Sequence, residues 1–157
     1  AEAYNAHLEN FPKNADKYGP FFKQWLEMGS NVSQTEYIQA SKQRATSNGI
    51  MRRAFDGIDA MICPSVPRLP HDVDDSINYG AVATNRASRG IPEYFQRFTV
   101  PFDYNGYPTI SIPSGYSESG LPMSLQIVGT HNQEPLISRV GYAFEKEIKS
   151  IWKHPIT

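Results

Sequence analysis

Residues 99–129 constrain the fold of this chain more than any other stretch, because they hold two strand patterns joined by a turn-forming segment. Apolar and polar residues alternate over 109–112 and again over 123–128, which is typical of strands with one dry face. The segment between them is rich in Gly, Pro and Ser, residues that favour turns. The sequence therefore predicts two neighbouring strands and a surface loop from Pro113 to Pro122.

Helices are predicted before and after these strands. Ser33 and Glu36 form the spacing of a capping box, in which side chain and main chain satisfy each other's free amide groups at a helix start. A long helix is therefore expected over residues 34–55. Apolar stripes predict three more helices, at residues 1–8, at residues 21–28, and at residues 134–149 with Asn132 as the N-cap.

A further strand is predicted at residues 58–63. This run is nearly all apolar, which indicates a strand covered on both faces, as strands of parallel sheets are. Helices then alternate with strands along the chain, so the fold class is α/β. We expect residues 1–157 to be part of a single domain, with residues 1–57 mainly helical and residues 58–157 holding the strands and the last helix.

The composition excludes some classes of function. The net charge is −1 and no basic patch is present, so no nucleic-acid partner is expected. No run reaches the ~18 apolar residues of a membrane-spanning helix. The single cysteine, Cys63, lies in an apolar run and is interpreted as a buried, inert thiol.

No catalytic or metal-binding set can be assembled from the residues alone. The cluster from His71 to Asp75 has suitable ligand types, but its spacing fits neither a helical His pair nor a calcium loop, so we predict no metal and no cofactor. Ser114 and Ser119 each precede a glycine in the predicted loop, where turn formation explains them. The four histidines are scattered and are interpreted as surface residues.

The order of residues across the two strands carries a resemblance. The pattern Thr-x-Pro-x-x-x-Asn-Gly-x-Pro-x-Ile-Ser-Ile-Pro-x-Gly starts at Thr99, and Gly-Leu-Pro-x-x-Leu-Gln-Ile-Val-Gly ends at Gly129. Together they resemble the C-terminal part of the amidase signature family. The resemblance implies the C-terminal part of a mixed sheet flanked by helices, and cleavage of carboxamides by a Ser-cis-Ser-Lys triad. The family's catalytic Lys and Gly/Ser-rich nucleophile segment match no position here, so this chain is expected to carry no catalytic residue.

The resemblance also implies a substrate-binding segment. The loop matching residues 96–105 lines the substrate cavity in family members, so Gln96, Thr99, Phe102 and Asn105 are expected to bind substrate. Gln96 matches the position at which the glutamyl-tRNA amidotransferase member of the family holds the amine of glutamine with an acidic residue. Because an amide cannot balance an ammonium charge, glutamine is disfavoured as a substrate.

Aromatic residues near this segment favour an apolar or aromatic substrate group. They are Phe102, Tyr104 and Tyr107, and plain packing in the core remains the alternative for each of them.

Two functions from different classes follow. The first is the C-terminal portion of an amidase signature hydrolase acting on a small-molecule amide, with the triad in an N-terminal polypeptide of the same enzyme. The second is a catalytically inactive binding or scaffolding subunit with the same architecture. We expect a fragment, since only the last third or so of a family member is matched. Homo-oligomerisation is left open, and so is the compartment, with the cytoplasm favoured.

Overall fold

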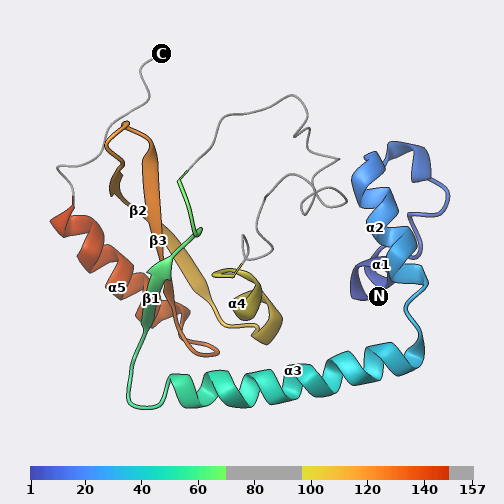
Figure 1. Cartoon of the computed structure of the whole chain (residues 1–157), viewed down its shortest axis with the longest axis horizontal. Coiled ribbons are helices and arrows are strands. Elements are labelled where there is room, and N and C mark those ends of the chain that lie inside the picture. Colours follow the sequence, from blue (N-terminus) through green and yellow to red (C-terminus); the bar gives the residue numbers. More distant parts are fainter. Residues whose placement is uncertain (70–96, 149–157) are drawn as a thin grey trace. The chain divides into compact units, whose positions relative to one another are not determined.

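The computed structural model describes residues 1–69 and 97–148 of the 157-residue chain. These residues belong to two compact units. The N-terminal unit contains residues 1–45, and the sheet unit contains residues 46–69 and 97–148 (Figure 1). The long helix α3 (Gln34–Ala54) begins in the first unit and ends in the second.

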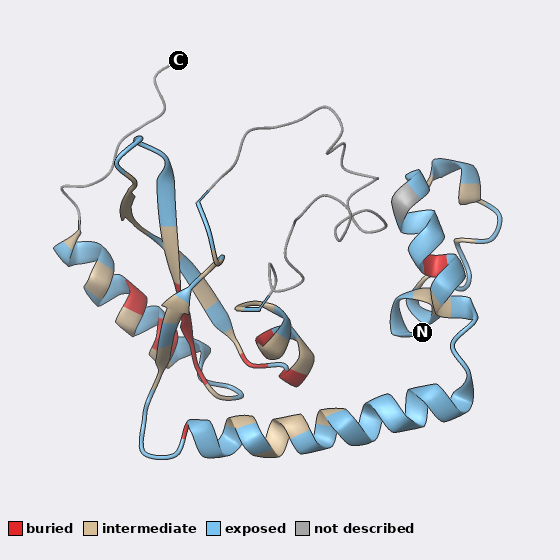
Figure 2. Cartoon of the chain, viewed as in Figure 1, coloured by how far each residue is buried: buried red, intermediate tan, exposed pale blue. Residues whose placement is uncertain are grey.

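The N-terminal unit is helical. It holds α1 (Glu2–Ala6), the short 3-10 helix η1 (Ala15–Lys17), α2 (Pro20–Ser30) and the start of α3. Pro20 opens α2, at a position where its missing amide hydrogen costs nothing. Leu26 is fully buried, whereas Trp25 and Met28 are 53% and 62% exposed. The expectation that the aromatic stripe of α2 forms core is therefore wrong for Trp25, because α1 covers only one narrow face of the helix (Figure 2).

The capping box of α3 is confirmed. The main-chain amide of Ser33 donates to Oε2 of Glu36 at 2.8 Å, and the amide of Glu36 donates to Oγ of Ser33 at 3.2 Å. The hydroxyl of Ser33 also donates to Oε2 of Glu36 at 2.6 Å. These hydrogen bonds, the side-chain one first, hold the pKa of Glu36 below its ordinary value of 4.5.

The sheet unit contains a three-stranded antiparallel sheet in the order β1-β3-β2. Its strands are β1 (Met61–Pro64), β2 (Thr109–Tyr116) and β3 (Pro122–Val128). The strand predicted at 58–63 exists but starts later, and its assignment as a parallel-type strand is wrong. It pairs antiparallel to β3, with Met61 opposite Val128. Its burial alternates along the strand, with Ile62 60% exposed, so an apolar run alone did not establish cover on both faces.

Strand β2 is longer than predicted, because it continues through Pro113 to Tyr116. Pro113 lies opposite Ser124, and the register shifts between Pro113 and Gly115. Among the described residues β2 pairs only with β3, and a proline is tolerated on such an edge because its missing amide breaks no ladder. The predicted loop is thus reduced to the turn before Pro122.

The sheet has a different cover on each face. Helix α5 (Glu134–Glu147) packs on β2 and β3, and Gly141 brings its backbone against Ile110 and Ile127. Val128, the next residue along β3, points to the opposite face and joins a buried cluster with Phe55, Phe102 and Tyr107.

The start of α5 differs from the prediction. Gln133, not Asn132, is the N-cap residue, and no side chain caps the helix. Asn132 has a φ of 64°, a left-handed conformation that asparagine tolerates better than most residues. Asn132 therefore forms the turn that leads into α5 instead of capping the helix.

Candidate functional site

Three of the four residues predicted to bind substrate lie on or beside one short helix, α4 (Val100–Asn105). The sequence analysis treats this segment as a loop, and it missed the helix because Pro101 reads as a breaker; Pro in the first turn is instead compatible with a helix. Thr99 is the N-cap residue, and its carbonyl accepts hydrogen bonds from the amides of Phe102 and Asp103, both at 3.0 Å. Gln96 lies outside the described residues.

Phe102 belongs to the core of the sheet unit. It is 5% exposed and clusters with Phe55, Tyr107 and Val128. The rings of Phe55 and Tyr107 meet edge to face, with centroids 5.2 Å apart, a favourable aromatic geometry. Packing therefore accounts for Phe102 and Tyr107 within this chain, while Tyr104 is half-buried.

Asn105 closes α4 with its side chain turned inward. The residue is 5% exposed, and its Oδ1 accepts a hydrogen bond from the amide of Tyr107 at 2.9 Å. Its Nδ2 is buried without a hydrogen-bond partner among the described residues. An unpaired buried donor costs about 1–3 kcal/mol, so this amide is a group whose stability depends on an acceptor reaching it.

Two polar residues near α4 were not predicted. Gln126 on β3 is 2% exposed, and its Nε2 donates to the carbonyl of Phe98 and to Sγ of Cys63. Cys63 is half-buried rather than buried. Gln126 thus ties the segment before α4 to the sheet, and the only signal for it in the sequence was a polar residue inside an apolar strand pattern.

His131 is the second residue that was missed. It was interpreted as a surface histidine, and it is exposed, but its Nε2 lies 2.8 Å from the carbonyl oxygen of Asn105. Its ring meets the ring of Tyr107 edge-on, with centroids 4.8 Å apart. The two residues are far apart in the sequence, so only the fold brings them together.

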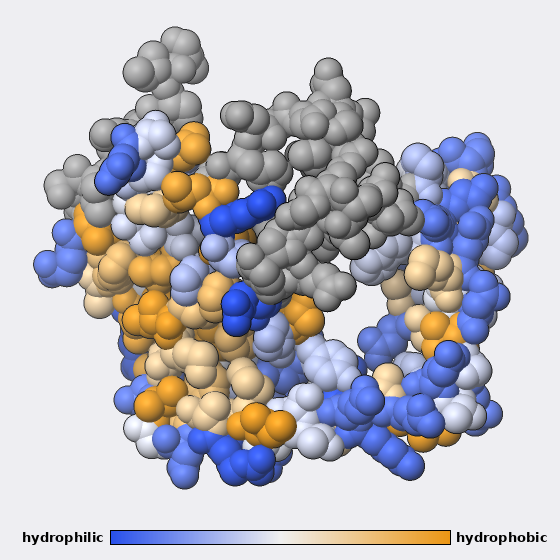
Figure 3. Space-filling model, viewed as in Figure 1, coloured by the Kyte–Doolittle hydropathy of each residue, from blue (hydrophilic) through white to orange (hydrophobic). Residues whose placement is uncertain are grey.

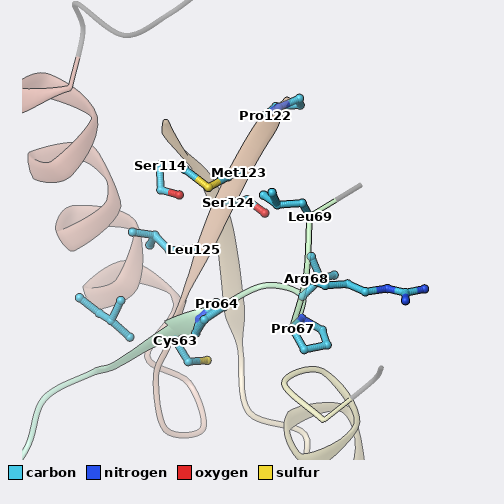
Figure 4. A pocket seen from close by; sticks show the side chains of 12 residues that line it. Cys63, Pro64, Pro67, Arg68, Leu69, Ser114, Pro122, Met123, Ser124 and Leu125 are labelled. Atoms are coloured by element: carbon cyan, nitrogen blue, oxygen red, sulfur yellow. The ribbon is translucent and has the colours of Figure 1, made fainter. Parts of the chain in front are cut away.

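A hollow of about 610 Å³ lies at one end of the sheet, where β1 leaves it and the β2–β3 hairpin turns (Figure 4). Arg68 is the only charged residue among the described residues that line it. Four of the lining residues are apolar with more than a third of their surface exposed: Ile62, Val66, Leu69 and Met123. Hydrophobic side chains also gather on the sheet unit in Figure 3. We refer to this feature as the apolar hollow.

The serines of the hairpin are engaged in turn contacts. Oγ of Ser117 lies 2.9 Å from Oγ of Ser119 and accepts a hydrogen bond from the amide of Leu121 at 3.1 Å. Within residues 1–69 and 97–148, no group of three or more His, Cys, Asp or Glu side chains is placed to hold a metal ion. The cluster from His71 to Asp75 lies outside this part of the chain. None of the helices in the same ranges has the length and apolar character needed to cross a membrane.

The fold, a mixed α/β arrangement with a small antiparallel sheet flanked by helices, has known relatives. A crystal structure of an amidase superimposes with a TM-score of 0.70 at 24% identity, covering 92% of this chain and 32% of that one. The sequence model of the Amidase family matches residues 2–137. The chain therefore belongs to the amidase family, which is characterised by the amidase signature.

Two curated relatives place the match within longer proteins. AmiD of Mycobacterium bovis, whose name designates it an amidase, is 29% identical over 90% of this chain and 28% of its own length. The amidase-like component of the glutamyl-tRNA(Gln) amidotransferase of a Cyanothece strain is 27% identical over 90% of this chain and 28% of its own length. The chain thus spans about 28% of the length of these relatives.

Proposed function

We propose that this chain is the C-terminal portion of an amidase signature hydrolase that cleaves the C–N bond of a non-peptide carboxamide. In this proposal the Ser-cis-Ser-Lys triad lies in an N-terminal polypeptide of the same enzyme, and residues 1–157 complete a single amidase domain. The observation that carries the proposal is the family match over residues 2–137 in a chain that spans only 28% of its relative AmiD.

The chemistry of amide cleavage supports a division of labour between the two parts. A serine nucleophile needs a base within hydrogen-bonding reach and donors for the oxyanion that forms on the carbonyl oxygen. Ser117 and Ser119 contact each other and their own turn, which explains them without a catalytic role. The role proposed for this chain is therefore to shape the substrate pocket.

The proposed pocket wall consists of Gln96, Thr99, Phe102 and Asn105. The unpaired Nδ2 of Asn105 supports this assignment, because a substrate carbonyl would supply the acceptor that the buried amide lacks. Asn105 is covered by its neighbours in this chain, so a substrate reaches Nδ2 only when α4 or the side chains over it shift. The aromatic residues around α4 favour an apolar or aromatic acyl or amine group, and Gln96 disfavours glutamine.

The proposed macromolecular partner is the N-terminal polypeptide. The apolar hollow supports this partner, since exposed apolar side chains grouped in one concave surface are characteristic of a contact site. The main-chain groups along β2 are a second argument, because an unpaired strand edge can accept a further strand.

The alternative is a catalytically inactive binding or scaffolding subunit that keeps the same architecture. The packing of Phe102 in the core is compatible with it, because a buried ring needs no substrate to explain it. The two functions differ in what precedes Ala1 in the encoding reading frame. A Gly/Ser-rich segment and an upstream Lys are expected for the hydrolase.

The deciding experiment expresses the complete reading frame and, separately, residues 1–157. Both are assayed for release of 4-nitroaniline from 4-nitroacetanilide and of ammonia from benzamide and hexanamide. We expect turnover by the complete protein and none by residues 1–157 alone. A complete protein that binds these amides without turning them over would favour the inactive subunit. Turnover by residues 1–157 that survives substitution of Ser114 and Ser119 would contradict the division of labour.

A further inference from the structure

We infer that His131 is a positioning residue for the proposed pocket, and that it acts by holding the main chain of Asn105. The inference rests on the proposed function, since it concerns how the segment with Asn105 is kept in place for substrate. His131 reaches this segment from the turn between β3 and α5, which belongs to the same sheet unit.

The hydrogen bond fixes which ring nitrogen of His131 carries a proton. Nε2 lies 2.8 Å from the carbonyl oxygen of Asn105, and a carbonyl oxygen can only accept. Nε2 must therefore be protonated, in the neutral ring as in the imidazolium. The edge of the Tyr107 ring, with centroids 4.8 Å apart and an interplanar angle of 88°, restrains the imidazole from the side.

The acceptor is a helix-terminal carbonyl that would otherwise be free. The last carbonyls of a helix have no partner within the helix, and a histidine near the C-terminus can supply one. The carbonyl of Phe102 is already used, by the amide of Gly106 at 2.8 Å and that of Tyr107 at 3.1 Å. The imidazole satisfies the carbonyl of Asn105 in the same way.

The turn that carries His131 holds the segment between α4 and β2 at two points. Besides the imidazole contact, the amide of Gly129 donates to the carbonyl of Pro108 at 3.0 Å. Gly106 lies between these points with a φ of 76°, a conformation that glycine adopts without strain and that leaves this segment few restraints of its own. The two contacts from the turn therefore define where the end of α4 lies.

Fixing this segment also fixes the proposed substrate contact. Oδ1 of Asn105 is held by the amide of Tyr107, so the direction of Nδ2 follows the main chain of residues 105–107. Loss of the His131 contact would let the end of α4 move and would take Nδ2 out of line with a substrate carbonyl. His131 thus acts through Asn105 and touches no substrate itself.

The test uses the complete protein with three variants. His131→Phe keeps a ring against Tyr107 and loses the donor, whereas His131→Gln keeps an N–H donor and loses the ring. His7→Phe is the matched control, because His7 also makes a side-chain hydrogen bond, to Tyr18 at 2.9 Å, and an edge-on ring contact, but lies in the N-terminal unit. Hydrolysis of 4-nitroacetanilide and deuterium exchange of the amides of Gly106 and Tyr107 are measured for each.

For His131→Phe we expect KM to rise about tenfold with kcat within about twofold, the pattern of lost uniform binding, and exchange at both amides to accelerate about fivefold. His131→Gln should restore both values to within about threefold of wild type, and His7→Phe should change neither. In a double-mutant cycle, Asn105→Ala should abolish the effect of His131→Phe on KM.

Two results would overturn the inference. Unchanged exchange at Gly106 and Tyr107 in His131→Phe would mean that the imidazole does not restrain this segment. Faster exchange with an unchanged KM, or additive effects in the cycle, would mean that the restraint is structural only. A wild-type protein inactive on every amide would contradict the proposed function instead, and the exchange measurement would still decide whether His131 holds Asn105.

Discussion

At the scale of single residues, Phe102 is where packing and substrate contact compete. The Phe102→Leu variant keeps an apolar side chain in the core cluster, so it should cost less than about 1.5 kcal/mol of stability. If the ring also lines the pocket, KM for an aryl amide should rise about tenfold while KM for hexanamide stays unchanged.

Phe55→Leu is the matched control, because Phe55 is equally buried in the same cluster but is not among the proposed substrate-binding residues. Steady-state kinetics of the complete protein with both amides compare the two variants. Equal changes in KM for both substrates, or equal effects of the two variants, would assign Phe102 to the core alone.

Gln96 gives a second prediction at this scale, drawn from the sequence. Gln96→Asp restores a negative charge where the amidotransferase has an acidic residue, so it should shift preference toward amides that carry a free α-amine. The ratio of kcat/KM for glutamine to that for hexanamide measures the shift, with Gln96→Asn as the uncharged control. A ratio that does not change would mean that Gln96 is not directed toward the substrate.

At the scale of elements, the start of α3 has a titration that can be measured. The largest cause of the lowered pKa of Glu36 is the side-chain hydrogen bond from Ser33, so Ser33→Ala should raise this pKa toward 4.5. A lowered folded-state pKa stabilises the protein above the unfolded pKa, and this stabilisation is lost as the pH falls through the folded pKa. NMR titration of the Glu36 carboxyl group measures the change, and Thr35→Ala should leave it unaltered. An unchanged pKa in Ser33→Ala would show that the capping box does not persist in solution.

Two glycines separate close packing from helix propensity at α5. A Cβ at Gly129 would lie 2.8 Å from Cγ2 of Ile137, whereas one at Gly141 would lie 3.4 Å from the nearest side-chain atom, Cδ1 of Ile110. Gly129→Ala should therefore destabilise the protein by about 1–3 kcal/mol, and Gly141→Ala should stabilise it by about 0.5–1 kcal/mol because a helical glycine is replaced. Denaturant unfolding measures both, and free energies that change by the same amount would contradict the packing described for Gly129.

Local interactions were predictable from the sequence, and contacts between distant segments were not. The box formed by Ser33 and Glu36 needs only neighbouring residues, and its helix was predicted within one residue of its end. Pro113 and Asn132 were misassigned because a proline on a strand edge and an asparagine in a left-handed turn depend on tertiary context. The contact between His131 and Asn105 joins two elements on either side of the hairpin, so no spacing in the sequence could indicate it.

At the scale of the whole molecule, the exposed apolar surface determines what the chain can do alone. A chain of this length normally buries about 68–70% of its unfolded surface. Here Ile62, Met123 and other residues of the apolar hollow remain exposed, and α5 covers only one face of the sheet. The grouping of such residues beside a strand edge favours association.

We therefore expect residues 1–157 to associate tightly with the N-terminal polypeptide of the same protein, through an interface well above the ~1,600 Å² of a standard complex. Purified alone, the chain should bind a hydrophobic dye and elute as an aggregate or oligomer. Met123→Lys, which places a charge in the apolar hollow, should weaken binding of a separately expressed N-terminal polypeptide, whereas the same change at exposed Tyr142 on α5 should not. Size-exclusion chromatography, dye fluorescence and co-purification measure these outcomes. A monomer that unfolds in one cooperative transition and binds no dye would contradict both the association and the partition of the enzyme into two polypeptide segments.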